Sequence, residues 1–417
     1  MKVLHLVVLV VGELGLSHAI IRGLGLFSSR HRCSASRIRS QEDAIKTGIE
    51  AFLASDEMLQ MINNMDADGD EDEEAWEDDE DEDDEEEFIG ADFAARVQQE
   101  LVDELDYAAK ALKEQAFLGP GEPLPLELSC QGAEAAAMAV SAIGPGVVRL
   151  QSALSAQTAS QLRTFVLAEL ETARGQSDGG LDHRAETRLS NVLAPEARWD
   201  LRLPMRGPVR TALRELLGEG SLLGGAFEIA AGGPSAELWE LAALISAPGA
   251  TAQIVHADCD GAPQPELLHT AFVALQPVTR ALGPTRWLPN SHVDAAGYSA
   301  FSAQGDVTVL RGTTSETAPL SYVGLLDTGD ASLYDGRILH CGGANTVYTS
   351  ANGVVDGAAN ADSADGDGVR ILFYMTFRSA NREDVISNPA ARSILTRYDG
   401  HVTLGMLRDK ERGFEGD

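Results

Sequence analysis

The spacing of apolar positions along the chain changes near residue 144. Before that point, apolar residues recur at roughly helical intervals in residues 41–64 and again in 91–117. The second of these segments ends at Gly119-Pro120-Gly121, a combination that stops a helix. We therefore predict a helical amino-terminal extension over residues 41–118, with a domain boundary at its end.

Beyond residue 144 the pattern favours a mainly β domain with flanking helices. A strand is predicted at Val147–Leu150 and a helix at Ser155–Arg174, and further short β-rich runs are Ala252–Val255, Thr270–Leu275, Ala331–Tyr334 and Val369–Phe377. Short strands separated by Gly- and Pro-containing turns are typical of a β barrel or a two-sheet jelly roll. Residues 351–368 lack periodicity and are predicted to form an inserted loop. The predicted domain spans 119–380, followed by a carboxy-terminal tail, 381–417.

The charge of the chain is strongly negative and unevenly distributed. The formal net charge is −33, and residues 66–87 contain 18 acidic side chains and no basic one. This balance argues against a nucleic-acid partner, because phosphate backbones are bound by Lys and Arg. The four cysteines form no C-x-x-C pair, and no stretch reaches the ~20 apolar residues of a membrane-spanning helix. A small molecule is the expected partner, and the sequence does not indicate an oligomeric state.

The first 40 residues resemble a targeting segment. An apolar run, Val3–Val11, precedes the small residues around Ser17-His18-Ala19, as in a secretory signal. The following segment, 18–40, is rich in Arg and Ser and lacks acidic residues, as in an organelle transit peptide. The expected compartments are therefore the secretory pathway or a plastid. The alternative is an amino-terminus without targeting value and a cytoplasmic protein.

The acidic segment resembles the first half of an EF-hand calcium loop. Asp66, Asp68 and Asp70 follow an amphipathic helix at loop positions one, three and five. Glu71 occupies position six, where an EF-hand needs Gly for a sharp turn. Two interpretations stay open, namely a calcium site at these three aspartates and a solvated acidic linker.

A second group of residues has the composition of an iron site. His256 and Asp258 are two residues apart on a predicted strand, so their side chains point to the same side. His340, near a second predicted strand, is the best candidate for a third ligand. Two histidines and one carboxylate on one face of a metal leave positions open for other ligands, which is the arrangement of non-haem Fe(II) oxygenases.

The motifs around these residues resemble those of the phytanoyl-CoA dioxygenase family. The matching segments occur in the family's order, namely Gln253–Asp258, Phe272–Thr279, Gly283–His292, Gly329–Asn345 and Arg370–Tyr374. The resemblance covers about residues 145–380. It implies a double-stranded β-helix, the jelly-roll barrel also found in cupins, and Fe(II) with 2-oxoglutarate as cosubstrate.

The resemblance also implies roles for single residues. His256, Asp258 and His340 match the iron ligands. Arg370 matches the arginine that binds the distal carboxylate of 2-oxoglutarate, with Arg378 as a rival on the same strand, and Gln253 matches a residue lining the pocket near the cosubstrate. Two features depart from the family. The 351–368 insertion lengthens the segment before Arg370, and Gly342 stands where the family often has a serine that supports the cosubstrate.

Two functions are consistent with these observations. The first is an Fe(II)- and 2-oxoglutarate-dependent dioxygenase that hydroxylates a small organic substrate and releases succinate and CO2. The second is a catalytically inactive jelly-roll protein that binds or regulates through a calcium-responsive amino-terminal segment. The complete set of His256, Asp258, His340 and Arg370 favours the enzyme.

Overall fold

The computed structural model describes residues 99, 102–104, 106–124, 132–177, 188–259, 268–312, 320–349, 355–356, 368–379 and 392–409. Residues Glu104–Asp417 form one compact unit, and it contains all the elements discussed below. The targeting segment 1–40 and the calcium-loop residues Asp66, Asp68 and Asp70 lie outside the described residues.

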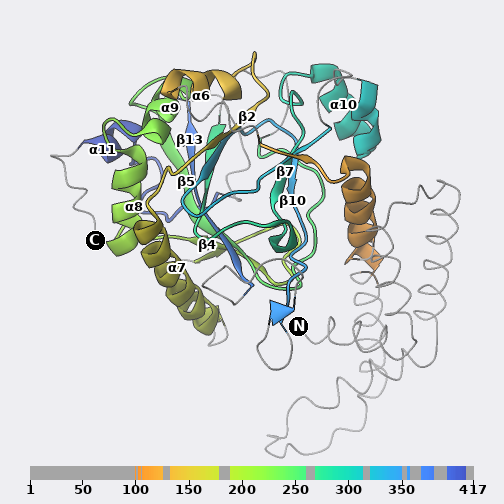
Figure 1. Ribbon diagram of the computed structural model, residues 1–417, viewed down its shortest axis with the longest axis horizontal. Coiled ribbons are helices and arrows are strands. Elements are labelled where there is room, and N and C mark those ends of the chain that lie inside the picture. The colour runs from red at the N-terminus through yellow and green to blue at the C-terminus, as the bar shows by residue number, and fades with distance from the viewer. Residues whose placement is uncertain are drawn as a thin grey trace, which may run out of the picture. The chain divides into compact units, whose positions relative to one another are not determined.

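Two mainly antiparallel sheets make the core of this unit (Figure 1). The larger sheet has, in spatial order, β2 (Val147–Leu150), β9 (Ala331–Asp335), β6 (Leu268–Ala274), β13 (Arg370–Arg378), β5 (Glu237–Ser246), β4 (Arg198–Arg202) and β3 (Leu189–Ser190). The smaller has β1 (Glu122–Pro123), β8 (Tyr322–Val323), β7 (Thr285–Trp287) and β10 (His340–Gly342), with β1 and β8 parallel. A separate hairpin joins β11 (Tyr348–Thr349) to β12 (Val355–Asp356). This architecture confirms the predicted mainly β, jelly-roll fold with flanking helices.

Helices cover the outer face of the larger sheet. They are α6 (Ala133–Val140), α7 (Ala156–Ser177), α8 (Gly207–Leu217), α9 (Leu222–Ala230) and α11 (Leu404–Arg408), and Figure 1 shows them gathered on one side of the strands. A further helix, α10 (Ala295–Gln304), and the short 3-10 helices η3 (Arg280–Leu282) and η4 (Val307–Gly312) lie in connections. In α8 the buried residues recur at three- and four-residue intervals, as expected for a helix with one apolar face.

Strand β13 is buried on both of its faces. Ile371, Phe373 and Met375 pack in the cluster that includes the covering helices. Leu372 and Tyr374 point the other way, into the cluster between the two sheets. Alternation along a strand produces this division. It also explains why the sequence reads as a continuous apolar run, since a strand buried on both faces needs no polar positions.

The predicted elements at residues 147–150, 155–174, 270–275, 331–334 and 369–377 are confirmed by β2, α7, β6, β9 and β13. The strand predicted at Ala252–Val255 is wrong. That segment has no regular secondary structure, and it is linked to β10 by an isolated bridge between His256 and His340 and by a hydrogen bond from Gln253 N–H to Gly342 O at 2.9 Å. Tertiary contacts with a neighbouring helix take the place of a second strand partner there. Of the predicted 351–368 loop, the structure describes Val355–Asp356 in β12 and Gly368.

The carboxy-terminal segment 392–409 packs on the barrel. Leu395, Tyr398 and Val402 are buried in the cluster between the larger sheet and the helices. The Tyr398 hydroxyl accepts a hydrogen bond from the Met205 backbone N–H at 2.8 Å, and Leu238 N–H donates to Val402 O at 2.9 Å. The packing of the domain therefore extends beyond residue 380. Among the described helices, none combines the length and apolar character that crossing a bilayer requires.

Candidate active site

His256, Asp258 and His340 converge at one end of the space between the sheets. Their ligand atoms lie within 4.8 Å of one another, and Asp258 Oδ1 is 3.4 Å from His340 Nε2. The irregular segment 253–258 supplies two of them and β10 supplies the third. The bridge between His256 and His340 brings these two parts of the chain together, with paired backbone bonds of 2.9 and 2.8 Å. The three predicted ligands therefore form one cluster.

Both imidazoles are oriented in the same way. Nδ1 of His256 lies 2.9 Å from Ile254 O, and Nδ1 of His340 lies 3.0 Å from Ile338 O. A carbonyl oxygen accepts only, so each Nδ1 carries the proton and each Nε2 keeps its lone pair for a metal. Two such nitrogens and one carboxylate are the donor set that suits non-haem Fe(II), so the residues fit this metal.

The electrostatics of the cluster also suit a divalent cation. Burial, reinforced by the nearby His340, lowers the pKa of His256 to about 4, so this imidazole is neutral near pH 7. Desolvation raises the pKa of Asp258, but His340, His256 and the Tyr334 hydroxyl outweigh it and bring that pKa to about 2. Desolvation lowers the pKa of His340, but Asp258 outweighs it and leaves the pKa raised. A metal would compete with a proton for the His340 Nε2 lone pair.

A helix outside the β domain supports the segment that carries His256. Residues 106–118 are helical and lie in the same compact unit. The Glu114 carboxylate accepts a hydrogen bond from Val255 N–H at 2.6 Å, and the Tyr107 hydroxyl accepts one from Ile254 N–H at 3.2 Å. These side chains satisfy backbone donors that a neighbouring strand would otherwise take. Sequence periodicity predicted this helix but gave no indication of the contact.

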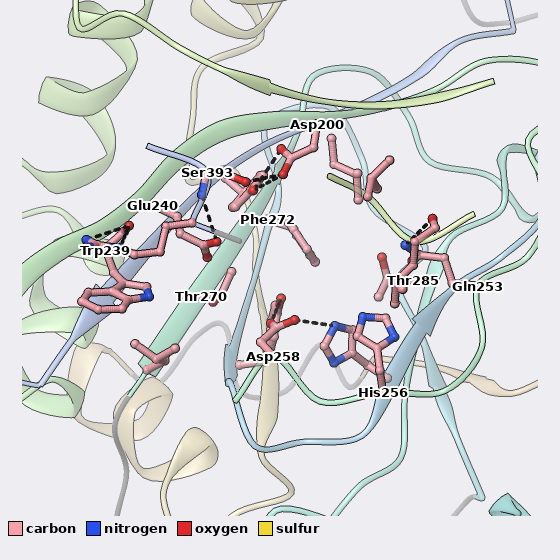
Figure 2. A pocket seen from close by; sticks show the side chains of 18 of the residues that line it. Asp200, Trp239, Glu240, Gln253, His256, Asp258, Thr270, Phe272, Thr285 and Ser393 are labelled. Atoms are coloured by element: carbon pink, nitrogen blue, oxygen red, sulfur yellow. Dashed lines mark hydrogen bonds and ion pairs between the residues drawn. The ribbon is translucent and has the colours of Figure 1, made fainter. Parts of the chain in front are cut away.

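Gln253 fills the place where the family's serine would point. Its Oε1 accepts a hydrogen bond from Gly342 N–H at 2.9 Å, and its Nε2 donates to Leu193 O at 3.2 Å. A Cβ atom on Gly342 would come within 2.5 Å of that Oε1. Gly342 and Gln253 are therefore coupled, because the Gln253 amide occupies the space that Gly342 leaves free. Figure 2 shows Gln253 beside Thr285 at the edge of the cavity.

Arg370 opens β13 on the inner face of the larger sheet. It is fully buried, and its Nη2 donates to Ser246 Oγ at 2.9 Å. Its Nε and Nη1 have no hydrogen-bond partner. Buried guanidinium donors are normally satisfied, so Nε and Nη1 are open to the oxygen acceptors of a ligand such as a carboxylate. The rival, Arg378, instead pairs with Glu237 and lies over the Trp239 ring.

The cluster opens into a cavity of about 270 Å³ (Figure 2). Thr270, Phe272 and Tyr374 are among the residues that line it. Asp200 and Glu240 lie on the side away from His256. Burial raises the pKa of Asp200 to about 6 and that of Glu240 to about 7. Neither carboxylate was singled out from the sequence, because an acidic residue within an apolar strand has no distinguishing neighbours there.

Residues 145–349 match the sequence profile described as phytanoyl-CoA dioxygenase (PhyH). Residues 145–349 thus form a phytanoyl-CoA dioxygenase domain. Its ligand cluster and its family make the chain an oxidoreductase of the Fe(II)- and 2-oxoglutarate-dependent oxygenase type. No curated protein matches the chain.

Several solved structures are similar to this phytanoyl-CoA dioxygenase domain. The α-ketoglutarate-dependent carbocyclase SnoK from nogalamycin biosynthesis is 19% identical, with 60% of this chain and 87% of SnoK covered and a TM-score of 0.41. EctD from S. alaskensis is 15% identical, with 69% and 91% covered and a TM-score of 0.41. HygX from Streptomyces hygroscopicus, solved with nickel and 2-oxoglutarate, is 15% identical, with 57% and 84% covered and a TM-score of 0.37.

Proposed function

We propose that the protein hydroxylates a small organic substrate with Fe(II), 2-oxoglutarate and O2, and that succinate and CO2 are the coproducts. One observation carries the proposal. Three metal-ligand side chains line the cavity, and a buried arginine with two unsatisfied donors lies on the inner face of the larger sheet. A metal site and a carboxylate site together are what this reaction requires. In the balanced reaction, one oxygen atom enters the substrate and the other enters succinate.

Different residues of the chain bind the metal, bind the cosubstrate and exclude water. His256, Asp258 and His340 hold Fe(II), and when bound the metal with its cosubstrate supplies the oxidising power. Arg370 binds the distal carboxylate of 2-oxoglutarate through guanidinium donors that its bond to Ser246 leaves free. Gln253 keeps the backbone after His340 in place through its bond to Gly342 N–H. The aromatic walls at Phe272, Tyr334 and Tyr374 exclude water from the reacting centre.

A turnover assay tests the metal assignment. His256→Ala should abolish succinate formation, because the two ligands left hold the metal too weakly. His401→Ala, an exposed histidine outside the cluster, serves as the matched control and should keep full activity. Retained succinate formation in His256→Ala would contradict the proposal.

A binding measurement separates the enzyme from the inactive, regulatory alternative. Anaerobic addition of Fe(II) and 2-oxoglutarate to the full chain should produce the visible charge-transfer band of a metal-bound 2-oxo acid. A spectrum without this band would favour the regulatory protein.

The calcium site at Asp66, Asp68 and Asp70 stays a prediction, which calorimetric titration of the full chain with Ca²⁺ would test.

A further inference from the structure

A second arginine, Arg198, lies beside Arg370 at the inner face of the larger sheet. Arg198 is 1% exposed and projects from β4. Its five N–H donors all have acceptors, which are Ser246 Oγ and the carbonyl oxygens of Leu193, Ala194, Thr251 and Gly343, at 2.7–3.4 Å. A guanidinium has five such donors. Arg198 therefore has none left for a small-molecule ligand.

Ser246 connects the two arginines. It lies on β5 directly opposite Arg198 on one neighbouring strand and Arg370 on the other. Its hydroxyl oxygen accepts from Arg198 Nε at 3.3 Å and from Arg370 Nη2 at 2.9 Å. This shared acceptor fixes one edge of the Arg370 guanidinium. The other two nitrogens, Nε and Nη1, have no hydrogen-bond partner.

The pair forms a buried positive region with no directly paired carboxylate among the described residues, and Glu196 acts on Arg198 only at longer range. Among the described residues, neither Arg198 nor Arg370 takes part in a salt bridge. Burial lowers the pKa of Arg370 to about 9, and the charge of Arg198 adds to this effect. Burying two cations together is unfavourable unless an anion joins them. The arrangement is thus incomplete without a negatively charged ligand.

Arg198 also joins the cosubstrate end to the metal-bearing segments. Its bond to Thr251 O lies two residues before Gln253, and its bond to Gly343 O lies three residues after His340. A single side chain thereby sets the position of the Arg370 donors relative to the segments that carry the metal ligands. No motif of the sequence distinguishes this arginine, because its partners are backbone carbonyls.

We propose that Arg198 is a positioning residue for the cosubstrate, which orients Arg370 through Ser246 and adds a second positive charge without touching the ligand itself. This inference rests on the proposed function, in which Arg370 binds the distal carboxylate of 2-oxoglutarate. It requires that loss of Arg198 weaken binding of the distal carboxylate specifically. A purely structural brace would instead affect every ligand of the site.

The test compares two 2-oxo acids on the full chain. In anaerobic titrations with Fe(II), the charge-transfer band reports binding of 2-oxoglutarate and of 2-oxobutyrate, which lacks the distal carboxylate. Arg198→Lys should raise the dissociation constant of 2-oxoglutarate roughly tenfold or more, because Arg370 is then no longer oriented for its charge-assisted contact with the distal carboxylate. The dissociation constant of 2-oxobutyrate should stay within about twofold, as expected for a contact it does not make. Arg202→Lys, on the same strand, is the matched control and should change neither.

The inference would be overturned if Arg198→Lys weakened the binding of 2-oxoglutarate and of 2-oxobutyrate equally, or weakened neither. Ser246→Ala provides a milder variant if Arg198→Lys does not fold, and it should shift 2-oxoglutarate binding in the same direction. A double variant tests whether Arg198 acts through Arg370. In a chain that already carries Arg370→Lys, adding Arg198→Lys should change the dissociation constant of 2-oxoglutarate little. Unchanged 2-oxoglutarate binding in Arg370→Lys alone would overturn the cosubstrate assignment as well. An effect of Arg370→Lys without one of Arg198→Lys would overturn only the role of Arg198.

Discussion

The Tyr334 hydroxyl donates a hydrogen bond to Asp258 Oδ2 at 2.9 Å, while Oδ1 of the same carboxylate faces His340 Nε2 at 3.4 Å. Tyr334 is 1% exposed, and its ring centroid lies 5.2 Å from that of His340. One oxygen of the carboxylate is therefore held by the core, and the other is presented to a metal. Partners of this kind orient ligands before the metal arrives.

Tyr334→Phe should lower the affinity for Fe(II) by roughly 10- to 100-fold, since it removes the partner that orients Asp258. The ring remains, so the loss of one hydrogen bond should change the free energy of unfolding by only about 1 kcal/mol. Competition with a chromogenic chelator measures the affinity. Tyr374→Phe is the matched control, because its hydroxyl donates to Asp200 instead of a metal ligand. Equal losses of metal affinity in both variants would contradict the specific role of Tyr334.

Gly342→Ser should weaken 2-oxoglutarate binding even though it restores the residue common in the family. The new Cβ would come within 2.5 Å of Gln253 Oε1 and displace the amide that holds this backbone. Overpacking of this kind typically destabilises by about 1–3 kcal/mol. Gln253→Ala in the same chain makes room for the serine, so the double variant should be more stable than Gly342→Ser alone. Urea denaturation of the three variants measures this coupling, and additive effects would show that the two residues act independently.

The sequence predicted the parts of the site that depend on alternation and motif order. The spacing of His256 and Asp258 predicts that their side chains point to the same side, and the motif around His340 predicts the third ligand. In the structure all three side chains lie together. Sequence reasoning could not find Tyr334, because its role depends on the register between β9 and its neighbours. Asp258, in contrast, was expected on a regular strand and lies on an irregular segment. Long-range contacts from residues 106–118 determine that segment, and local propensity carries no information about them.

Glu114→Ala should weaken Fe(II) binding by loosening the segment that carries His256. The substitution leaves the Val255 N–H buried without its acceptor, which costs about 1–3 kcal/mol. The same helix reaches the other side of the cluster, where Gln115 Nε2 lies 3.1 Å from Cys341 Sγ. Chelator competition and urea denaturation should therefore both respond.

Lys113→Ala is the control for this helix, because the Lys113 side chain is 59% exposed and pairs with Asp306 at the surface. It should change neither metal affinity nor, by more than about 0.5 kcal/mol, stability. If Glu114→Ala lowers the stability but leaves the metal affinity unchanged, the helix supports the fold and not the metal site.

Asp200 should make the metal-free protein less stable as the pH rises from about 4 to about 6. Burial raises the pKa of this carboxyl from 3.8 to about 6. Below pH 4 the folded and unfolded states are both protonated. Between the two pKa values Asp200 loses its proton in the unfolded state and keeps it in the folded state. Deprotonation therefore stabilises the unfolded state, and the free energy of unfolding decreases. The decrease relative to Asp200→Asn should approach about 3 kcal/mol and level off above pH 6.

Asp306 provides a control of opposite sign. The backbone and hydroxyl of Thr308 donate to its carboxylate and lower its pKa. Its contribution is therefore present above the ordinary pKa of an aspartate and is lost as the pH falls. Chemical denaturation of wild type, Asp200→Asn and Asp306→Asn should show the two effects in different ranges of pH: the Asp200 contribution is lost as the pH rises from about 4 to about 6, and the Asp306 contribution is lost as the pH falls below about 4. A pH-independent difference between wild type and Asp200→Asn would mean that Asp200 is ionised in the folded protein, held by the Tyr374 and Ser393 hydroxyls.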